Sequence, residues 1–227
     1  MQKLCSIIPC YNEARTIGPI VKRLREKGLD VYVADDGSTD ETSSLARAEG
    51  AIVIRNQSNL GKGAALREGF KEVLKGDYGE VLLIDGDDQH DVSDMNNLID
   101  RMEETGAGLV IGNRMRDTSE MPIVRIVVNR FMSYILSKVS GQYVPDTQCG
   151  YRLIKSDVLK NTELESSNYE IESEMIVAVA RAGYKIESTS IKTVYQNEKS
   201  RINPVIDTLR FMRLMIKIIL KRERNKK

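Results

Sequence analysis

The sequence lacks tryptophan altogether and has one histidine, three cysteines and five prolines among its 227 residues. Cys5, Cys10 and Cys149 follow neither the CxxC pattern nor a zinc-ligand spacing, which argues against a disulfide framework and a zinc module and suits a reducing compartment. No uncharged stretch approaches the roughly 20 apolar residues that cross a bilayer. The chain enters a strand-like segment at Lys3, so we expect no signal peptide and a cytoplasmic protein.

Neither sign of charge is in excess, with 34 Lys and Arg against 33 Asp and Glu. The absence of a global positive field argues against a nucleic-acid partner. The length suits one α/β domain, and we find no repeat, low-complexity segment or linker. Within the single domain 1–227 we distinguish a regular half at 1–112, a more variable half at 113–203 and a C-terminal helix at 204–227.

Short apolar runs alternate with longer amphipathic segments along the first half of the chain. The runs predict buried parallel strands at residues 4–8, 31–34, 51–54, 81–84 and 109–111. The segments between them predict helices at 16–27, 39–49, 62–74 and 92–104. After residue 112 we expect strands at 185–189 and 191–196, and helices at 122–140, 170–182 and from Pro204 onward. This order predicts a Rossmann-like, doubly wound α/β fold with ligands beyond the carboxyl ends of the strands.

Two polar turns follow the first two predicted strands and are expected at the same edge of the sheet. The first reads PCYNE at residues 9–13, and the second reads DDGSTD at residues 35–40. Helix capping accounts for the serine and threonine of the second turn. It does not account for adjacent carboxylates, which repel each other unless donors or cations bind them. Ribose hydroxyls and base N–H groups are suitable donors, and Tyr11 can flank a base, so we favour nucleoside binding over capping alone.

The sharpest motif is DGDDQH at residues 85–90, directly after the apolar run of the fourth predicted strand. Residues two apart in an extended chain point the same way, so Asp85, Asp87 and Gln89 can converge. Two carboxylates and an amide oxygen suit Mg²⁺ or Mn²⁺, and such an ion bridges a protein to a diphosphate. An acidic loop that only caps the next helix is the alternative. For His90, the only histidine, we favour a hydrogen-bonded loop position, with a supporting role left open.

A glycine-rich stretch, GKGAAL at residues 61–66, invites comparison with phosphate-binding loops. It fits neither the P-loop spacing nor the dinucleotide fingerprint, and it does not directly follow a strand. We interpret it as the start of a helix, with Lys62 a candidate for contact with phosphate.

Four motifs together resemble those of the GT-A-fold family 2 glycosyltransferases. They are IIPCYNE (7–13), DDGSTD (35–40), NLGKG (59–63) and DGDDQH (85–90). Within that family the chain is most similar to the dolichyl-phosphate mannosyltransferase and polyprenyl-phosphate glycosyltransferase branch. The resemblance implies that the 1–112 half binds a GDP- or UDP-linked sugar, with Mg²⁺ or Mn²⁺ as cofactor. It implies a nucleoside site that consists of Pro9, Tyr11, Glu13 and Asp36 with Asp35 close by, and metal ligands that are Asp85, Asp87 and Gln89. Gly86 stands where the family commonly has alanine.

The 113–203 half bears on the acceptor. Arg114 follows the fifth predicted strand, and Arg125 and Asn129, four residues apart, share one helix face. The resemblance implies that these three residues bind an acceptor phosphate, for which arginine is well suited; a solvated helix face is the alternative. In the signature DTQCGYR at 146–152, Asp146 is either a general base for a hydroxyl acceptor or a structural partner of Arg152, which is a further candidate for acceptor binding.

The C-terminal segment is basic and amphipathic, with eight Lys and Arg against two acids in residues 207–227. As a helix it places a narrow basic stripe beside a wide apolar arc, which suits a helix lying in a bilayer interface. Packing of the arc on the domain or on a second subunit is the alternative. We expect peripheral association with the cytoplasmic face of a membrane, with a separate membrane-protein partner left open.

The resulting hypothesis is an inverting, metal-dependent hexosyltransferase that moves mannose or glucose from a nucleoside-diphosphate sugar to a polyprenyl or dolichyl phosphate. The candidate catalytic residues are Asp87, Arg114, Arg125 and, for a hydroxyl acceptor, Asp146. Two alternatives stay open: a family 2 enzyme with a hydroxyl acceptor on a glycan or small molecule, and a nucleotide-sugar-binding protein without catalysis. A sugar-phosphate nucleotidyltransferase is disfavoured because residues 9–13 are not a glycine- and arginine-rich phosphate loop.

Overall fold

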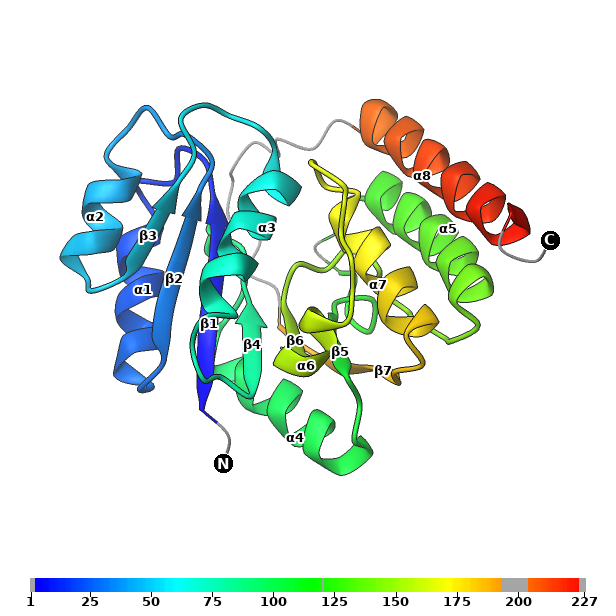
Figure 1. Ribbon diagram of the computed structural model, residues 1–227, viewed down its shortest axis with the longest axis horizontal. Coiled ribbons are helices and arrows are strands. Elements are labelled where there is room, and N and C mark those ends of the chain that lie inside the picture. The colour runs from blue at the N-terminus through cyan, green and yellow to red at the C-terminus, as the bar shows by residue number, and fades with distance from the viewer. Residues whose placement is uncertain (1–2, 120, 193–203, 225–227) are drawn as a thin grey trace.

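The computed structural model describes residues 3–119, 121–192 and 204–224, and in the last segment it describes the side chains of residues 208–218 (Figure 1). The strands are β1 (Leu4–Cys10), β2 (Asp30–Asp35), β3 (Ile52–Arg55), β4 (Glu80–Leu83), β5 (Leu109–Asn113), β6 (Arg152–Lys155) and β7 (Ile186–Ser190). The helices are α1 (Ile17–Glu26), α2 (Thr42–Ala48), α3 (Lys62–Val73), α4 (Met95–Thr105), α5 (Ile123–Ser140), α6 (Ser156–Lys160), α7 (Ile171–Arg181) and α8 (Pro204–Arg224), and the 3₁₀ turn η1 (Val92–Asp94) precedes α4.

The strands form one seven-stranded sheet in the order β3-β2-β1-β4-β6-β5-β7. Strand β6 runs antiparallel to both of its neighbours, and the other pairs are parallel. This arrangement confirms the predicted doubly wound, mostly parallel α/β fold. Strand β1 lies between β2 and β4, with Cys10 opposite Asp35 and Ile7 opposite Leu83. The turns that follow these three strands therefore open at one edge of the sheet.

The predicted strands of the first half and the predicted helices are present, with shifted ends, and the strand predicted at 185–189 is β7. The sequence analysis missed β6 and α6, and β6 lies between β4 and β5 in the sheet. The reason lies in the sequence of β6, RLIK, which has only two apolar residues in a row between two charged ones. The strand predicted at 191–196 lies largely outside the described residues.

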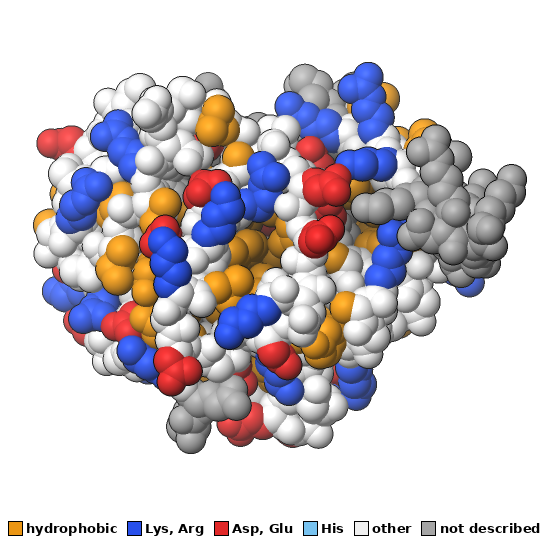
Figure 2. All heavy atoms as spheres, in the orientation of Figure 1, with side chains coloured by type: hydrophobic (Ala, Val, Ile, Leu, Met, Phe, Trp, Pro, Cys, Tyr) orange, Lys and Arg blue, Asp and Glu red, His pale blue; other side chains and the backbone are white. Residues whose placement is uncertain are grey.

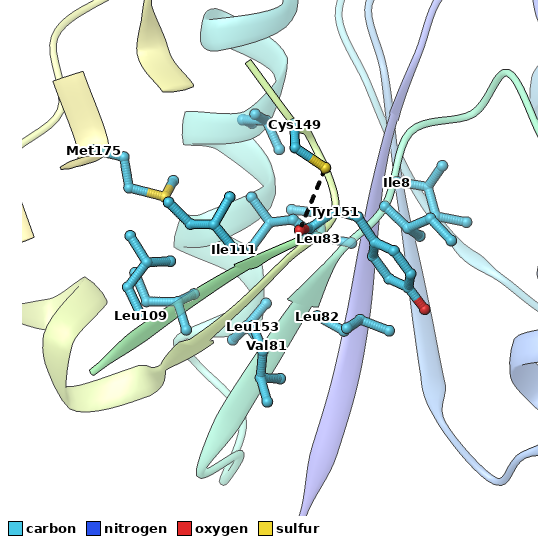
Figure 3. Packing of buried hydrophobic residues seen from close by; sticks show 14 of the residues in the cluster. Ile8, Val81, Leu82, Leu83, Leu109, Ile111, Cys149, Tyr151, Leu153 and Met175 are labelled. Atoms are coloured by element: carbon cyan, nitrogen blue, oxygen red, sulfur yellow. Dashed lines mark hydrogen bonds between the residues drawn. The ribbon is translucent and has the colours of Figure 1, made fainter. Parts of the chain in front are cut away.

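The core surrounds the central strands, which are buried on both faces, as near-continuous apolar strands require. Figure 3 shows Ile8 of β1, Leu82 of β4, Leu109 of β5 and Leu153 of β6 within this cluster, together with Met175 of α7. Helix α3 packs on β1 and β2 and also contacts α7, which in turn packs on α5. The two halves of the chain are thus joined through the sheet and through the α3–α7 contact.

Helix α8 packs on the domain and also exposes apolar side chains. Among the side chains that the structure describes in α8, four are buried, namely Phe211, Leu214, Met215 and Ile218. The Arg181 guanidinium of α7 donates a hydrogen bond to the Ile218 carbonyl at 2.9 Å. The outer side of α8 exposes Leu209, Met212 and Ile216. The alternative in which the apolar arc packs on the domain therefore holds for part of the arc. None of the described helices is long and apolar enough to cross a membrane.

Candidate functional site

A cleft of about 630 Å³ opens at the carboxyl ends of β1 and β4. Its walls come from the turn after β1, the starts of α3 and α7, the acidic loop after β4, and single residues from the segment after β5 and from α5. The structure brings together there most of the predicted site residues: Pro9, Tyr11, Glu13, Asp36, Lys62, Asp85, Asp87, Gln89, Arg114 and Arg125. Four others are buried beside the cleft without lining it, namely Asp35, Asn129, Asp146 and Arg152.

Hydrogen bonds tie the turn after β1 to the turn after β2. The Asn12 backbone N–H donates to the Ser38 hydroxyl at 2.8 Å, and the Thr39 backbone N–H donates to Asn12 Oδ1 at 2.8 Å. Asn12 has a φ of 54°, the left-handed conformation that asparagine tolerates better than most residues. This cross-linked pair of turns fixes the wall on which Tyr11 and Glu13 lie.

The adjacent carboxylates of the second turn are satisfied by the protein itself. Asp35 is fully buried and accepts a hydrogen bond from the Ser38 backbone N–H at 2.8 Å. Asp36 accepts hydrogen bonds from the backbone N–H groups of Leu60 (2.9 Å) and Gly61 (2.7 Å). The sequence argument assigned these donors to a nucleoside, and the structure shows that the protein supplies them. Asp35 therefore has a structural position outside the cleft, whereas Asp36 lines the cleft and holds the loop that leads into α3.

The acidic loop after β4 separates its carboxylates into two groups. The three predicted metal ligands line the cleft, namely Asp85, Asp87 and Gln89. Asp88 instead pairs with Arg23 of α1, and Asp91 caps η1 by accepting a hydrogen bond from the Ser93 backbone N–H at 2.8 Å. The tertiary structure thus decides which acids of this loop face the cleft, a choice that the sequence leaves open.

Lys62 bridges the acidic loop and α7, an arrangement that the sequence analysis did not foresee. Its ammonium lies 2.6 Å from Asp85 Oδ1 and 2.6 Å from Glu172 Oε1. Burial alone would lower the pKa of Lys62, but the two carboxylates raise it above its ordinary value. Burial would likewise raise the pKa of Asp85, and the charge of Lys62 holds it below its ordinary value. The cleft therefore contains a permanent cation beside its carboxylates.

Two glycines of the 61–66 stretch make this placement possible. Gly61 has a φ of +100°, which few other residues adopt, and a Cβ atom at Gly63 would lie 2.4 Å from the Ser166 carbonyl oxygen. The start of α3 can therefore pack directly on the loop before α7, which brings Lys62 to Glu172. Sequence reasoning missed Glu172 because an acid in the first turn of a helix is too common to identify a site residue.

The ligand set on this wall fits a divalent cation. Asp85, Asp87 and Gln89 offer the hard oxygen ligands that Mg²⁺ and Mn²⁺ prefer. The described residues contain no cluster of three or more His, Cys, Asp or Glu that would enclose a metal ion. The absence of a side chain at Gly150 leaves room for the Asp85 carboxylate, since a Cβ atom at Gly150 would lie 2.2 Å from Asp85 Oδ2.

His90 packs on a neighbouring ring, and the hydrogen bond that we expected of it is not found at Nδ1. Its ring stacks on that of Tyr151, with the centroids 5.2 Å apart and the planes inclined by 28°. Nδ1 is buried and has no hydrogen-bond partner among the described residues. Burial lowers the pKa of His90 to about 4, against the opposing effect of Asp85. His90 therefore lines the cleft as a neutral side chain at physiological pH.

On the wall of the same cleft, Arg114 is held by a buried carboxylate. Its Nε and Nη2 donate hydrogen bonds to Asp146 at 2.8 and 2.9 Å, and its backbone N–H donates a third at 3.1 Å. Asn129 Nδ2 donates a fourth at 2.7 Å. Burial alone would raise the pKa of Asp146, but Arg114 and Asn129 hold it below its ordinary value. A carboxylate with four donors and a depressed pKa is a poor base, and in this structure Asp146 holds the Arg114 guanidinium in place.

Arg152 and Asn129, both predicted to bind the acceptor, lie outside the cleft. The Arg152 guanidinium is fully buried and donates to the carbonyls of Cys149 (2.8 Å), Thr147 (2.9 Å) and Glu172 (2.7 Å). It thereby ties the 147–152 segment to α7. Arg114, and not Arg152, is the structural partner of Asp146.

An acidic loop paired with a lysine lies at the carboxyl edge of a doubly wound sheet, with three arginines in the same cleft, and this arrangement fits a transferase that uses a nucleotide-activated donor. The sequence profile described as glycosyl transferase family 2 matches residues 5–162. The chain therefore belongs to glycosyl transferase family 2.

Named relatives support this assignment. The glycosyltransferase AglJ of Haloferax volcanii is 34% identical over 210 residues, which cover 91% of this chain and 67% of the relative. A UDP-N-acetylglucosamine–dolichyl-phosphate N-acetylglucosaminyltransferase of Methanococcus voltae is 28% identical over 212 residues, which cover 83% of this chain and 84% of the relative.

The fold is shared with solved structures. Glucosyl-3-phosphoglycerate synthase from Mycobacterium tuberculosis, solved with phosphoglyceric acid, superposes with a TM-score of 0.70 at 21% identity, covering 97% of this chain and 80% of that chain. The same synthase has been solved with Mn²⁺ and uridine diphosphate. At this identity the likeness establishes the GT-A fold and not the substrates.

Proposed function

We propose that the protein transfers a hexose, with inversion, from a GDP- or UDP-linked sugar to a polyprenyl or dolichyl phosphate. The observation that carries this proposal is the pairing of Arg114 with the fully buried Asp146. This pairing disfavours Asp146 as a base for a hydroxyl acceptor, and it holds Arg114 in a cleft that Arg125 also lines. A phosphate is already an anionic nucleophile and needs no base, and the M. voltae relative is named for a dolichyl-phosphate acceptor.

The donor would lie along the wall formed by the two cross-linked turns and the acidic loop. Tyr11 and Glu13 would contact the nucleoside, and Lys62 would neutralise part of the diphosphate charge. A divalent ion held by Asp85, Asp87 and Gln89 would stabilise the charge on the departing diphosphate. Mannose or glucose is the proposed sugar, and the name of the M. voltae relative makes N-acetylglucosamine the first alternative.

The acceptor phosphate would be held by Arg114 and Arg125, whose guanidinium groups grip phosphate oxygens through paired donors. Asp146 and Asn129 fix the Arg114 guanidinium before the acceptor arrives. A phosphate oxygen would then form a bond to the anomeric carbon while the bond to the diphosphate oxygen breaks. A single displacement of this kind inverts the configuration at that carbon.

A lipid acceptor also requires contact with a membrane, and we propose that α8 provides part of it at the cytoplasmic face. Its outer side carries Leu209, Met212 and Ile216 beside Arg213. An exposed apolar stripe next to basic residues suits an interfacial helix.

A small phosphorylated acceptor is a second candidate, since the same arginines would bind it. The structurally similar synthase is named for phosphoglycerate, which favours this alternative. The two candidates differ in the acceptor and in its nucleophile, because phosphoglycerate also carries a hydroxyl group, which would need a base.

The test is an assay of nucleotide release with GDP- and UDP-sugars, Mn²⁺ or Mg²⁺, and either polyprenyl phosphate or 3-phosphoglycerate. We expect turnover with the lipid phosphate only, and a loss of at least 100-fold in Arg125→Ala, about the effect of removing one charged transition-state contact. Arg116→Ala is the matched control, since Arg116 is an exposed arginine outside the cleft. Turnover with phosphoglycerate and none with lipid phosphate would replace the proposal by the second candidate, and no turnover with any donor would refute both.

A further inference from the structure

Helix α5 presents large apolar side chains to solvent along its outer face. These side chains are each between 51 and 77% exposed and belong to Ile123, Val124, Val127, Phe131 and Tyr134. Their spacing of three to four residues places them on one side of the helix. An exposed helix face is ordinarily polar, and a contiguous apolar patch of this kind marks an interaction site.

The opposite face of the same helix supports the acceptor end of the cleft. Asn129 and Met132 are buried on that face, and Asn129 holds Asp146 at 2.7 Å. Arg125, in the first turn of α5, lines the cleft. One helix therefore has a polar contact with the catalytic cleft on its inner side and an apolar surface on its outer side.

The charges on the outer face indicate what covers it. Arg130 and Lys138 are exposed on this face, and α5 contains no acidic residue. A second copy of the chain packed symmetrically on this face would bring these cations toward each other, which is unfavourable. An anionic lipid surface attracts them and accepts the apolar side chains between them.

Helix α8 extends the same pattern. Both α5 and α8 pack on α7, and Figure 1 draws them nearly parallel. Figure 2 shows Lys and Arg side chains spread over this whole face of the molecule, some of them near the part where α8 lies. The outer residues of α8 again combine apolar Leu209 and Ile216 with basic Arg213.

We propose that the outer face of α5 is a membrane-docking surface that inserts its apolar side chains into an anionic bilayer, with α8 beside it. This inference rests on the proposed lipid-phosphate acceptor and extends it to the way the lipid is reached. Docking through α5 would bring its first turn, and with it Arg125, to the level of the lipid headgroups. A lipid phosphate could then enter the cleft while its hydrocarbon chain stays in the bilayer.

The test is co-sedimentation of the full chain with vesicles of phosphatidylcholine alone and of phosphatidylcholine with phosphatidylglycerol. The double variant Val127→Glu/Phe131→Glu places two charges on the outer face of α5. The control is Ile52→Glu, which places a charge on an equally exposed apolar residue of β3. The thermal unfolding midpoint of each variant shows that it is folded, since all the substituted side chains are exposed.

We expect tighter binding to the anionic vesicles, a loss of at least tenfold in the double variant, and binding by Ile52→Glu within twofold of the parent. Vesicle binding that is absent in the parent, or unchanged in the double variant, would overturn the inference. A third outcome would also overturn the inference: light scattering shows that the parent is a dimer and the double variant a monomer, while vesicle binding is the same in both. Vesicle binding with the expected losses but no sugar transfer would refute the proposed function and leave the docking surface standing.

Discussion

Replacing Asp146 by asparagine separates a positioning role from a catalytic one. The native carboxylate is fully buried and accepts three hydrogen bonds from Arg114 and one from Asn129. Asparagine has the same shape but no charge, and its amide nitrogen would face one of these donors. The Arg114 guanidinium, whose side chain is only 16% exposed, would then lack its counter-charge.

Breaking a buried ion pair by removing one partner costs about 3–5 kcal/mol. For a chain of this size each kcal/mol lowers the melting temperature by roughly 2–4 °C, so we expect the Asp146→Asn variant to melt about 10 °C below the parent. Calorimetry measures this shift directly. Asp117→Asn is the matched control because Asp117 is exposed and bonds only to Ser119, and its change in stability should stay within about 0.5 kcal/mol.

Kinetics of the same variant complete the test. A displaced Arg114 should raise the KM for the acceptor, with the pH profile of kcat unchanged in shape. A variant that melts with the parent but loses kcat together with the acidic limb of its pH profile would refute this reasoning, because a general base acts only in its deprotonated form. It would restore Asp146 as a general base and favour a hydroxyl acceptor.

Three further predictions follow from the buried groups. Because the folded-state pKa of Asp146 is depressed, its contribution to stability is present above the unfolded value of about 3.9 and is lost as the pH falls through the folded pKa. The free energy of unfolding, measured with urea, should therefore fall below about pH 4 by more in the parent than in Asp146→Asn. Gly150→Ala should displace Asp85 and weaken metal-dependent nucleotide binding at least tenfold in calorimetry. Gly18→Ala, whose new Cβ meets nothing closer than 3.9 Å, should bind as the parent does. Burial raises the pKa of all three cysteine thiols well above the ordinary value, so a thiol reagent at pH 8 should label none of them until the protein unfolds.

The sequence alone was sufficient to predict those features of the fold and the site that depend on residues close together in the chain. The apolar runs of β1, β2 and β4 and the polar turns behind them identified the sheet edge at which the cleft opens, because parallel strands end at a common edge. The spacing of Asp85 and Asp87 after a buried strand marked the acidic wall in the same way. These features depend on backbone periodicity and on residues that are neighbours in the chain.

Only the tertiary structure decided how distant residues pair. Glu172 meets Lys62 across 110 positions, and Asp146 meets Arg114 across 32. Nothing in the sequence around Glu172 distinguishes it from a helix cap, and the signature around Asp146 does not show which arginine it pairs with. The same holds for β6, whose four residues become a strand because β4 and β5 lie on either side of it. Contacts between residues far apart in sequence depend on how the whole chain packs, and a local pattern carries no record of that packing.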